Sequence, residues 1–219
     1  KKKINRLIII PARLGSKRIK NKNIKKFFKK PIIFYSIESA IKSKLFQKIH
    51  ISTESKKILN LTKKYKLKTD FLRPKKLSGD NIKTFDVIKF VVKEFENKGV
   101  LFDEIWCMSS CSPLINYKDL IRASEALNKN PNKIILPITE YSAPIDWAFK
   151  VGKNNHLKPK NIGSFNIKSQ NLTKYYHDID NFICFKKKLL HKIDKDFTID
   201  LNYHGLKFPK HKSIDIDDL

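Results

Sequence analysis

Cationic side chains gather in a loop that directly follows the first strongly apolar segment of the chain. Residues 7–10 (Leu-Ile-Ile-Ile) form an unbroken aliphatic run, which is typical of a strand buried on both faces inside a parallel sheet. Open α/β sheets bind phosphorylated ligands at the carboxyl ends of such strands. The residues after Pro11 supply the positive charge and the small side chain that phosphate groups require, and they predict a nucleotide site: Arg13, Gly15, Ser16, Lys17, Arg18 and Lys22.

The loop differs from the two commonest phosphate-binding motifs. Neither G-x-x-x-x-G-K-[ST] nor G-x-G-x-x-G occurs in the chain. A P-loop NTPase and a dinucleotide-binding protein therefore lose their main sequence support. The simpler alternative to a nucleotide site is a basic surface loop in a lysine-rich protein.

Two carboxylates near the end of the sequence offer a second chemistry. Asp215 and Asp217 alternate with Ile214 and Ile216, so in a strand both carboxylates point to the same face. Two like charges so close together repel each other unless a cation lies beside them. Oxygen ligands of this kind suit Mg²⁺, which completes its coordination with water and phosphate oxygens. The pair predicts a Mg²⁺ site, and by itself it fits an exposed edge strand with solvated aspartates equally well.

The net charge of +26 raises another class of function, a basic module that binds nucleic acid. All but five of the 47 cationic residues are lysines, and they are scattered through nearly every segment. Nucleic-acid-binding surfaces more often combine arginine with aromatic side chains on one face. The chain is also rich in Ile, Asn and Phe, whose codons, like those of Lys, are rich in A and T. We therefore expect attraction for acidic substrates but no specific nucleic-acid partner.

Length and composition indicate a single globular domain. The 219 residues, 41% of them hydrophobic, suffice for one α/β domain with a sizeable core. No apolar run approaches the ~20 residues that span a bilayer, so no membrane partner is expected. Cys107, Cys111 and Cys184 form an odd, widely spaced set that favours neither a disulfide framework nor a zinc site. With no recognisable signal sequence, a cytoplasmic location is expected.

Apolar periodicity predicts alternating strands and helices after the basic loop. Helical periodicity occurs at 31–42, 55–64, 84–96 and within 120–127, with Pro31 suited to the first turn of its helix and Ser55 to an N-cap. Strand-like segments occur at 7–10, 48–52, 69–72, 104–108 and 134–138. This alternation predicts βαβ units, and hence a Rossmann-like three-layer α/β/α domain over residues 1–219 with a mostly parallel sheet. At about 140–175 short strand-like pieces replace this pattern, which predicts a small β-rich excursion that covers the site or joins two copies.

Several motifs, in order along the chain, resemble the CMP-sialate/acylneuraminate cytidylyltransferase family, whose members activate 2-keto sugar acids as CMP conjugates. The opening loop P-A-R-x-G-S-K-R-I and the K-N-I that follows match the family's nucleotide loop, and S-I-D-I-D near residue 215 matches its metal-binding strand. The R-P-x-x-L-x-x-D segment at 73–80 and the S-P-L at 112–114 are also similar to family segments. The resemblance spans residues 4–217.

Within that family, the segment at 165–182 is similar to the pattern of pseudaminic acid cytidylyltransferases. It contains F-N-x-x-S-Q-x-L followed by Y-H-D and Phe182, and P-I-x-x-A-F-K precedes it at 144–150. The chain departs from the pattern in having Asp180 where the family usually has Gly, and Lys168 where Arg is common. The residues around Ser109–Cys111 are also unusual, so the sugar pocket is expected to differ in detail.

The resemblance implies a nucleotide-diphospho-sugar transferase type of fold and an enzyme that transfers CMP from CTP to the anomeric hydroxyl of a nonulosonic acid, releasing pyrophosphate. Pseudaminic acid is the preferred nine-carbon 2-keto acid, with N-acetylneuraminic, legionaminic and Kdo-type acids as alternatives. A nucleic-acid-binding module and a non-catalytic relative are the rival classes. The resemblance also implies a homodimer joined through the excursion, and Mg²⁺ as cofactor.

The same resemblance assigns roles to individual residues. Catalysis is expected from Arg13, Lys17, Asp215 and Asp217, the last two as Mg²⁺ ligands. Binding of CTP is expected from Arg13, Gly15, Ser16, Lys17, Lys22, Asn23, Arg73 and Thr84, and binding of the sugar from Ser109, Cys111, Gln170, His177 and Asp178. An ordinary hydrogen-bonded histidine is an equally good interpretation of His177, and no residue is assigned as the general base.

Overall fold

The computed structural model describes residues 4–15, 19–68, 70–193, 203–214 and 216. The aliphatic run at 7–10 becomes the centre of strand β1 (Arg6–Pro11), where all four side chains are fully buried. Leu7 and Ile9 face one hydrophobic core, and Ile8 and Ile10 face the other. Because a strand points successive side chains to opposite faces, such a run requires cover on both sides of the sheet.

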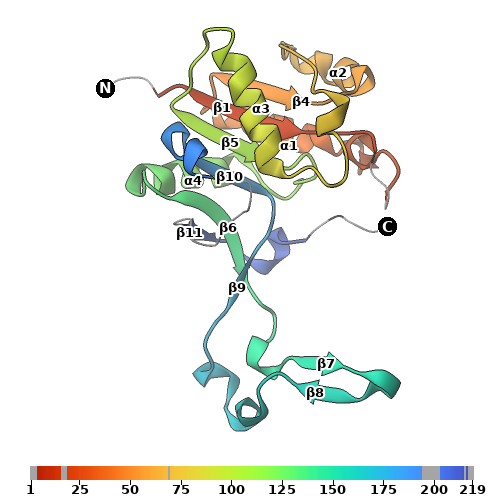
Figure 1. The fold of residues 1–219 in the computed structure, drawn as a ribbon, viewed down its shortest axis with the longest axis vertical. Helices are drawn as coiled ribbons and strands as arrows, with labels where there is room; N and C mark the ends of the chain where they lie inside the picture. Colours follow the sequence, from red (N-terminus) through yellow and green to blue (C-terminus); the bar gives the residue numbers. More distant parts are fainter. Residues whose placement is uncertain (1–3, 16–18, 69, 194–202, 215, 217–219) are drawn as a thin grey trace.

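β1 lies inside a seven-stranded sheet (Figure 1). The strand order is β11-β6-β10-β5-β1-β4, with β9 also paired to β6. The β1–β4, β1–β5 and β6–β11 pairs are parallel, whereas β10 runs antiparallel to β5 and β6. The other strands are β4 (Lys48–Ser52), β5 (Glu104–Met108), β6 (Ile134–Glu140), β9 (Tyr176–Asp178), β10 (Phe182–Lys186) and β11 (Tyr203–Lys207).

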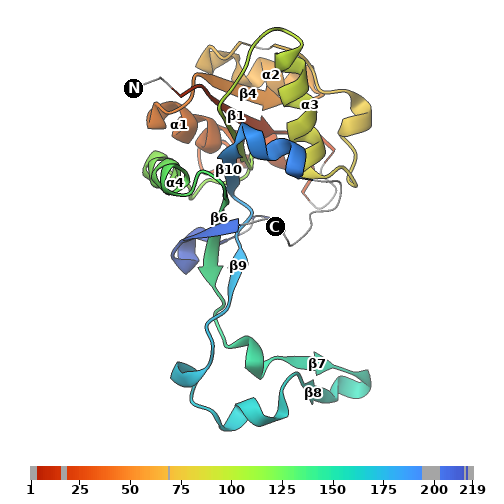
Figure 2. The ribbon, with the colours of Figure 1, turned by 60° about the vertical axis from the view of Figure 1, so that its left-hand side comes forward.

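Helices cover both faces of the sheet, as Figures 1 and 2 show together. Helices α1 (Ile33–Ser43), α2 (Lys56–Thr62) and α4 (Tyr117–Lys129) contribute to the core on one face. Helix α3 (Thr84–Glu96) and the 3₁₀ segment Lys187–Lys192 contribute to the core on the other. The predicted three-layer α/β fold with a mostly parallel sheet is therefore confirmed.

Local sequence signals account for several helix boundaries. Helix α3 has the predicted bounds and buries its apolar positions on one side. Ser55 is the predicted N-cap of α2, and its Oγ accepts a hydrogen bond from the Ile58 backbone N–H. Helix α4 begins with a capping box, in which the Asn116 and Asp119 side chains each accept from the other residue's backbone N–H.

Two predicted boundaries are wrong. Pro31 does not open α1, because it ends the two-stranded hairpin of β2 (Lys26–Phe27) and β3 (Lys30–Pro31), and the helix begins at Ile33. The segment 70–72 is not a strand. Its neighbour Arg73 donates a backbone hydrogen bond to the Thr53 carbonyl, just beyond the end of β4, which does not make a ladder.

An arm formed by residues 141–175 leaves the sheet after β6 and returns through β9 (Figures 1 and 2). It holds a hairpin of β7 (Phe149–Val151) and β8 (Leu157–Pro159). The Trp147 indole N–H donates to the Ser164 carbonyl, which ties the two sides of the arm together. Four 3₁₀ turns complete it: Ile145–Trp147, Lys153–Asn155, Ile162–Asn166 and Ser169–Asn171.

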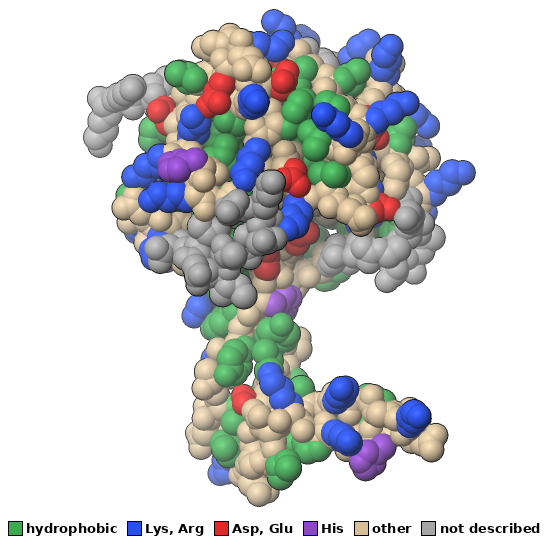
Figure 3. All heavy atoms as spheres, in the orientation of Figure 1, with side chains coloured by type: hydrophobic (Ala, Val, Ile, Leu, Met, Phe, Trp, Pro, Cys, Tyr) green, Lys and Arg blue, Asp and Glu red, His purple; other side chains and the backbone are tan. Residues whose placement is uncertain are grey.

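The surface carries its positive charge in a dispersed pattern. On the face drawn in Figure 3, lysine and arginine side chains are spread over the body and the arm rather than gathered in one patch. Among the described residues, no helix has both the length and the apolar character needed to cross a membrane.

Candidate active site

A cleft of about 610 Å³ opens at the carboxyl ends of β1 and β5. Its walls come from the loop after β1, the 3₁₀ turn Lys22–Ile24, residues 73–84, Ser110 and the segment before β10. This edge of a parallel sheet is where ligand sites form, because the loops that leave neighbouring strands converge there. Five of the residues predicted to bind the nucleotide line this one cleft: Arg13, Lys22, Asn23, Arg73 and Thr84.

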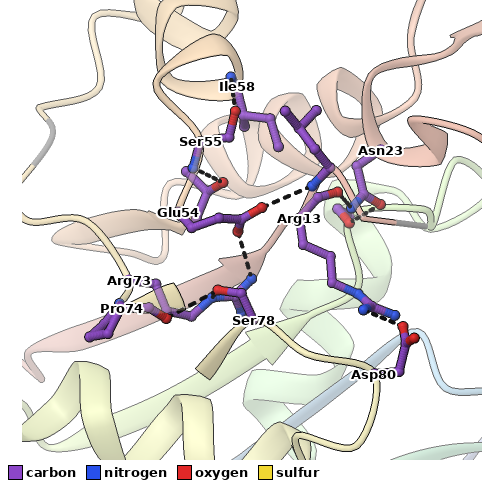
Figure 4. Close-up of polar contacts among 12 residues, drawn as sticks. Arg13, Asn23, Glu54, Ser55, Ile58, Arg73, Pro74, Ser78 and Asp80 are labelled. Carbon is purple, nitrogen blue, oxygen red and sulfur yellow. Dashed lines mark hydrogen bonds and ion pairs between the residues drawn. The ribbon is translucent and has the colours of Figure 1, made fainter. Parts of the chain in front are cut away.

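The basic loop is held to the rest of the cleft at two consecutive residues. The Arg13 guanidinium pairs with Asp80, with 2.5 Å between Nη1 and Oδ1 (Figure 4). The Arg13 carbonyl accepts a hydrogen bond from the Asn23 side-chain amide at 2.7 Å. The Leu14 backbone N–H donates to Glu54 Oε1 at 3.1 Å. The Asn23 side chain thus positions the backbone at Arg13, and the Glu54 side chain positions it at Leu14.

Asn23 joins three segments that lie far apart in the sequence. In addition to its bond to Arg13, its Oδ1 accepts from Ser110 Oγ at 2.8 Å and from Cys111 Sγ at 3.1 Å. Asn23 and Cys111 are both buried. The Asn23 and Cys111 side chains therefore connect segments within the cleft wall. Their predicted contacts with the nucleotide and the sugar stay predictions.

Arg73 is the most buried cation of the cleft wall. Its Nη2 donates to Glu54 Oε2 at 3.4 Å, and its Nε donates to Ser78 Oγ at 3.2 Å (Figure 4). Ser78 Oγ in turn donates to the Pro74 carbonyl. Burial lowers the pKa of Arg73, and the charge and hydrogen bond of Glu54 partly restore it. The guanidinium is therefore held in one orientation at the cleft.

Lys22 connects the cleft with the C-terminal motif. Its Nζ donates to the backbone carbonyl of Ile216 at 2.7 Å, which brings this residue of the S-I-D-I-D motif to the cleft wall. Four predicted site residues lie outside the described residues, namely Ser16, Lys17, Asp215 and Asp217, and their roles stay predictions. Within the described part of the chain, no group of three or more His, Cys, Asp or Glu side chains could hold a metal ion.

Gly15 is exposed, and a Cβ built on it would meet no atom within 4 Å. Packing within the protein therefore does not require glycine at this position. Close approach of a phosphate to the Gly15 backbone remains the predicted reason for it.

A smaller cavity of about 210 Å³ adjoins the cleft and shares part of its wall, including Thr84, Ser110 and Asp180. It also contains Ser109 and Asp178, two of the residues predicted to bind the sugar. Desolvation raises the pKa of Asp178, although backbone hydrogen bonds from residues 179 and 180 act in the opposite direction. The cavity thus combines hydroxyl and carboxylate groups, which suit a hydroxylated ligand.

Asp180 occupies a backbone conformation that glycine adopts most easily. Its φ is 48°, in the left-handed region, which Asp tolerates better than most other residues. Its backbone N–H donates to Asp178 Oδ1 at 2.8 Å. This left-handed conformation explains why glycine, the residue expected here from the family resemblance, suits the position. This chain instead has Asp180, which lines both cavities.

The remaining predicted sugar-binding residues lie elsewhere. Gln170 is in the arm, where it lines a separate hollow together with Tyr141 and Lys174. In β9, His177 Nδ1 is 2.8 Å from the Asp178 carbonyl oxygen, and the His177 ring packs 4.8 Å from that of Tyr141. As far as the structure is described, neither residue lines the cleft or the smaller cavity.

Glu54, Asp80 and Ser110 are not among the predicted site residues. Each of them contacts or adjoins a predicted residue at the cleft. Glu54 and Ser110 lie within two residues of the carboxyl ends of β4 and β5, respectively. Polar residues directly after the strands that flank β1 were therefore the signal that could have identified these two.

This sheet, with a cationic cleft at its carboxyl edge, defines an α/β enzyme that binds nucleotides. The family model described as cytidylyltransferase matches residues 7–204, and the chain belongs to the cytidylyltransferase family of CTP-dependent nucleotidyltransferases. It is 34% identical over 211 residues to the pseudaminic acid cytidylyltransferase of Campylobacter jejuni subsp. jejuni serotype O:2, covering 96% of this chain and 90% of that protein. The resemblance inferred from the motifs is thereby confirmed.

Other relatives act on related acids, according to their names. The CMP-N,N'-diacetyllegionaminic acid synthase of Legionella pneumophila is 28% identical over 215 residues, covering 96% of this chain and 90% of that protein. Among solved structures, a CMP:2-keto-3-deoxy-manno-octonic acid synthetase complexed with CTP superimposes with a TM-score of 0.67 at 14% identity, covering 93% of this chain and 90% of that one. This structural similarity supports the fold.

Proposed function

We propose that this cytidylyltransferase transfers CMP from CTP to the anomeric hydroxyl of a nonulosonic acid, with pseudaminic acid as its acceptor, and releases pyrophosphate. The observation that carries the proposal is the convergence of Arg13, Lys22 and Arg73 on one cleft at the carboxyl edge of the sheet. Cationic side chains around one cavity suit a nucleoside triphosphate, whose negative charge must be neutralised before a nucleophile can approach.

In this proposal, the cleft binds CTP. Arg13, Lys17 and Lys22 bind the triphosphate, with Gly15 and Ser16 donating hydrogen bonds, while Arg73 and Thr84 hold the cytidine. The acceptor's anomeric hydroxyl then attacks the α-phosphorus in line with the departing pyrophosphate. Catalysis of this kind comes mostly from positioning the reactants and from stabilising charge on the phosphate oxygens.

Mg²⁺ is the proposed cofactor, held by Asp215 and Asp217. When bound, it would supply further positive charge to the phosphates and lower the pKa of a bound hydroxyl. The hydrogen bond from Lys22 to the Ile216 carbonyl supports this assignment, because it brings the residue between the two aspartates to the cleft.

In this proposal, the smaller cavity binds the acceptor sugar. Ser109 and Asp178 line it, and we propose that they bind hydroxyl or acetamido groups of the acceptor. Ser109 also positions the Cys111 backbone, because the Ser109 Oγ accepts a hydrogen bond from the Cys111 N–H. Contacts from His177 and Gln170 would require a closer approach of β9 and the arm to the acceptor, or of the arm of a second copy.

A pyrophosphate-release assay with purified protein, CTP and Mg²⁺ tests the proposal. The acceptors are pseudaminic, legionaminic, N-acetylneuraminic and Kdo-type acids, and ATP, GTP and UTP replace CTP in parallel reactions. We expect the highest kcat/KM with CTP and pseudaminic acid, with the CMP-sugar identified by mass spectrometry. Preference for another acid would change the acceptor alone, whereas no CTP-dependent product with any acid would reject the function.

We also propose a homodimer joined through the arm. Apolar side chains stand exposed there, including Val151 at 61% and Ile162 at 83% of full exposure, which is typical of a surface that another protein covers. The double variant Val151→Glu/Ile162→Glu should convert a dimer into a monomer in analytical ultracentrifugation, because buried glutamates would be unpaired. A monomeric wild-type protein at micromolar concentration would reject the dimer.

A cytoplasmic location is the last part of the proposal. Cys107 and Cys184 are buried free thiols, and such thiols persist most easily in a reducing compartment. CTP is also a cytoplasmic substrate. Fractionation of cells that express the protein at native level, followed by the same assay, tests this location.

A further inference from the structure

Glu54 lies between the basic loop and Arg73, in the turn that follows β4 (Figure 4). One carboxylate oxygen accepts the Leu14 backbone N–H at 3.1 Å, and the other accepts Arg73 Nη2 at 3.4 Å. Its side chain is 19% exposed and that of Arg73 only 4% exposed. A single carboxylate therefore links two segments that both form the cleft.

The backbone on either side of Glu54 is firmly anchored. The Thr53 carbonyl accepts the Arg73 backbone N–H at 2.9 Å, and Thr53 Oγ1 accepts the Ser55 N–H at 3.1 Å. Ser55 then caps helix α2. Glu54 thus projects from the junction of a sheet strand and a helix, and such a rigid base can hold a side chain in one place.

From these contacts we infer that Glu54 is a positioning residue for nucleotide binding, which sets the Arg73 guanidinium and the basic loop in the geometry that CTP requires. The inference rests on the proposed function. A guanidinium buried as deeply as that of Arg73 needs a charged partner, and Glu54, which is not among the residues that line the cleft, supplies one. The planar guanidinium is then free to present its other N–H groups to a ligand.

The second arginine of the cleft has a different kind of partner. The Arg13–Asp80 pair is about one-third exposed on both sides, and pairs of this kind contribute little to stability because water competes for both charges. A triphosphate can therefore replace Asp80 as the partner of Arg13. The Glu54 contacts are less exposed and serve as the fixed support of the cleft.

The variant Glu54→Gln tests this inference, because glutamine keeps the shape and an acceptor for Leu14 but removes the charge that Arg73 needs. We expect the Kd for CTP, measured by calorimetry with Mg²⁺, to rise about tenfold, as is typical for loss of one charge-assisted hydrogen bond. The KM for CTP should rise in parallel, with a smaller change in kcat. Glu54→Ala, which also removes the Leu14 acceptor, should bind CTP still more weakly.

Glu38→Gln is the matched control. Glu38 also has two partners, Lys30 and Tyr65, and its side chain is 29% exposed. Its contacts join α1 to the β2–β3 hairpin and to Tyr65. We expect this variant to lose thermal stability to a similar degree as Glu54→Gln, while its Kd for CTP stays within twofold of the wild type.

A double-mutant cycle with Arg73→Gln distinguishes positioning from a general loss of stability. If Glu54 acts through Arg73, the double variant Glu54→Gln/Arg73→Gln should bind CTP no more weakly than Arg73→Gln alone. Additive effects in folded variants, or a wild-type Kd in Glu54→Gln, would overturn the inference while leaving the proposed function in place. Failure of the wild-type protein to bind CTP would overturn both.

Discussion

Asn23 and Ser110, 87 residues apart in the sequence, are joined by a 2.8 Å hydrogen bond from Ser110 Oγ to Asn23 Oδ1. The same amide side chain also bonds to the Arg13 carbonyl and to the Cys111 thiol. One buried residue thus connects the loops that follow the neighbouring strands β1 and β5.

Asn23→Ala should lower the free energy of unfolding by about 1–3 kcal/mol, since it leaves buried polar groups without their partner. Urea unfolding followed by tryptophan fluorescence measures this change. Asn60→Ala, at an exposed position of α2, is the control and should not lower stability. A loss below about 0.5 kcal/mol for Asn23→Ala, within the usual range for surface substitutions, would mean that the connection does not stabilise the fold.

Lys17→Ala should abolish formation of the CMP-sugar and leave the fold intact. We expect kcat/KM to fall by about 10²–10³-fold, the typical effect of removing one group that stabilises charge in the transition state. Lys129→Ala, at an exposed position of α4, controls for the loss of one positive charge from a highly basic protein. Turnover within a few-fold of wild type would show that Lys17 does not bind the triphosphate.

Asp217→Asn should remove the dependence of the reaction on Mg²⁺ together with the activity. A neutral amide is a much weaker ligand for a hard cation than a carboxylate, so the expected site would lose its charge as well as a ligand. Titration of pyrophosphate release with Mg²⁺ measures both effects. A variant that retains its activity and its Mg²⁺ requirement would exclude Asp217 as a ligand.

Stability should depend on pH through His50, which lies buried in β4 against the rings of Phe71 and Phe95. Burial lowers the pKa of His50 below its ordinary value of 6.5, although Asp70, 3.6 Å from Nδ1, acts in the opposite direction. The nearby charges of Lys48 and Arg73 lower it further. The unfolded chain therefore binds a proton at a higher pH than the folded chain does.

It follows that His50 contributes to a loss of stability as the pH falls below about 6.5, and that this contribution levels off below the depressed pKa of the folded state. His50→Phe should reduce the slope of the unfolding free energy between pH 7 and pH 5, as measured by urea titrations at several pH values. The slope is compared between the variant and the wild type, because the other five histidines are common to both. Equal slopes would contradict the assignment.

Local signals predicted much of the fold. The run Leu7–Ile10 predicted a strand buried on both faces, which is β1, and the apolar spacing at 84–96 placed α3 with the correct bounds. Ser55 was a recognisable cap. In each case, residues close together in the sequence determine the conformation, so no distant partner had to be known.

The errors involve backbone pairing that the apolar pattern of the sequence does not record. Pro31 suits the first turn of a helix, yet pairing with Lys26 places it in a hairpin. The segment before Arg73 has strand-like composition, but its described part makes no ladder, and the Arg73 backbone N–H donates to the Thr53 carbonyl just beyond the end of β4. The antiparallel insertion of β10 between β5 and β6 also depends on pairing that no local pattern records.

The sequence by itself determined the chemical character of this protein: a basic loop after a buried strand, an acidic pair near residue 215, and a set of motifs typical of cytidylyltransferases. Only the tertiary structure decided which of these residues meet. It brought Arg13, Lys22 and Arg73 to one cleft, placed Gln170 in the arm, and revealed Glu54 as the link between Leu14 and Arg73. The physical reason is that side-chain type follows from sequence, whereas contacts between loops follow from the order in which distant strands pair.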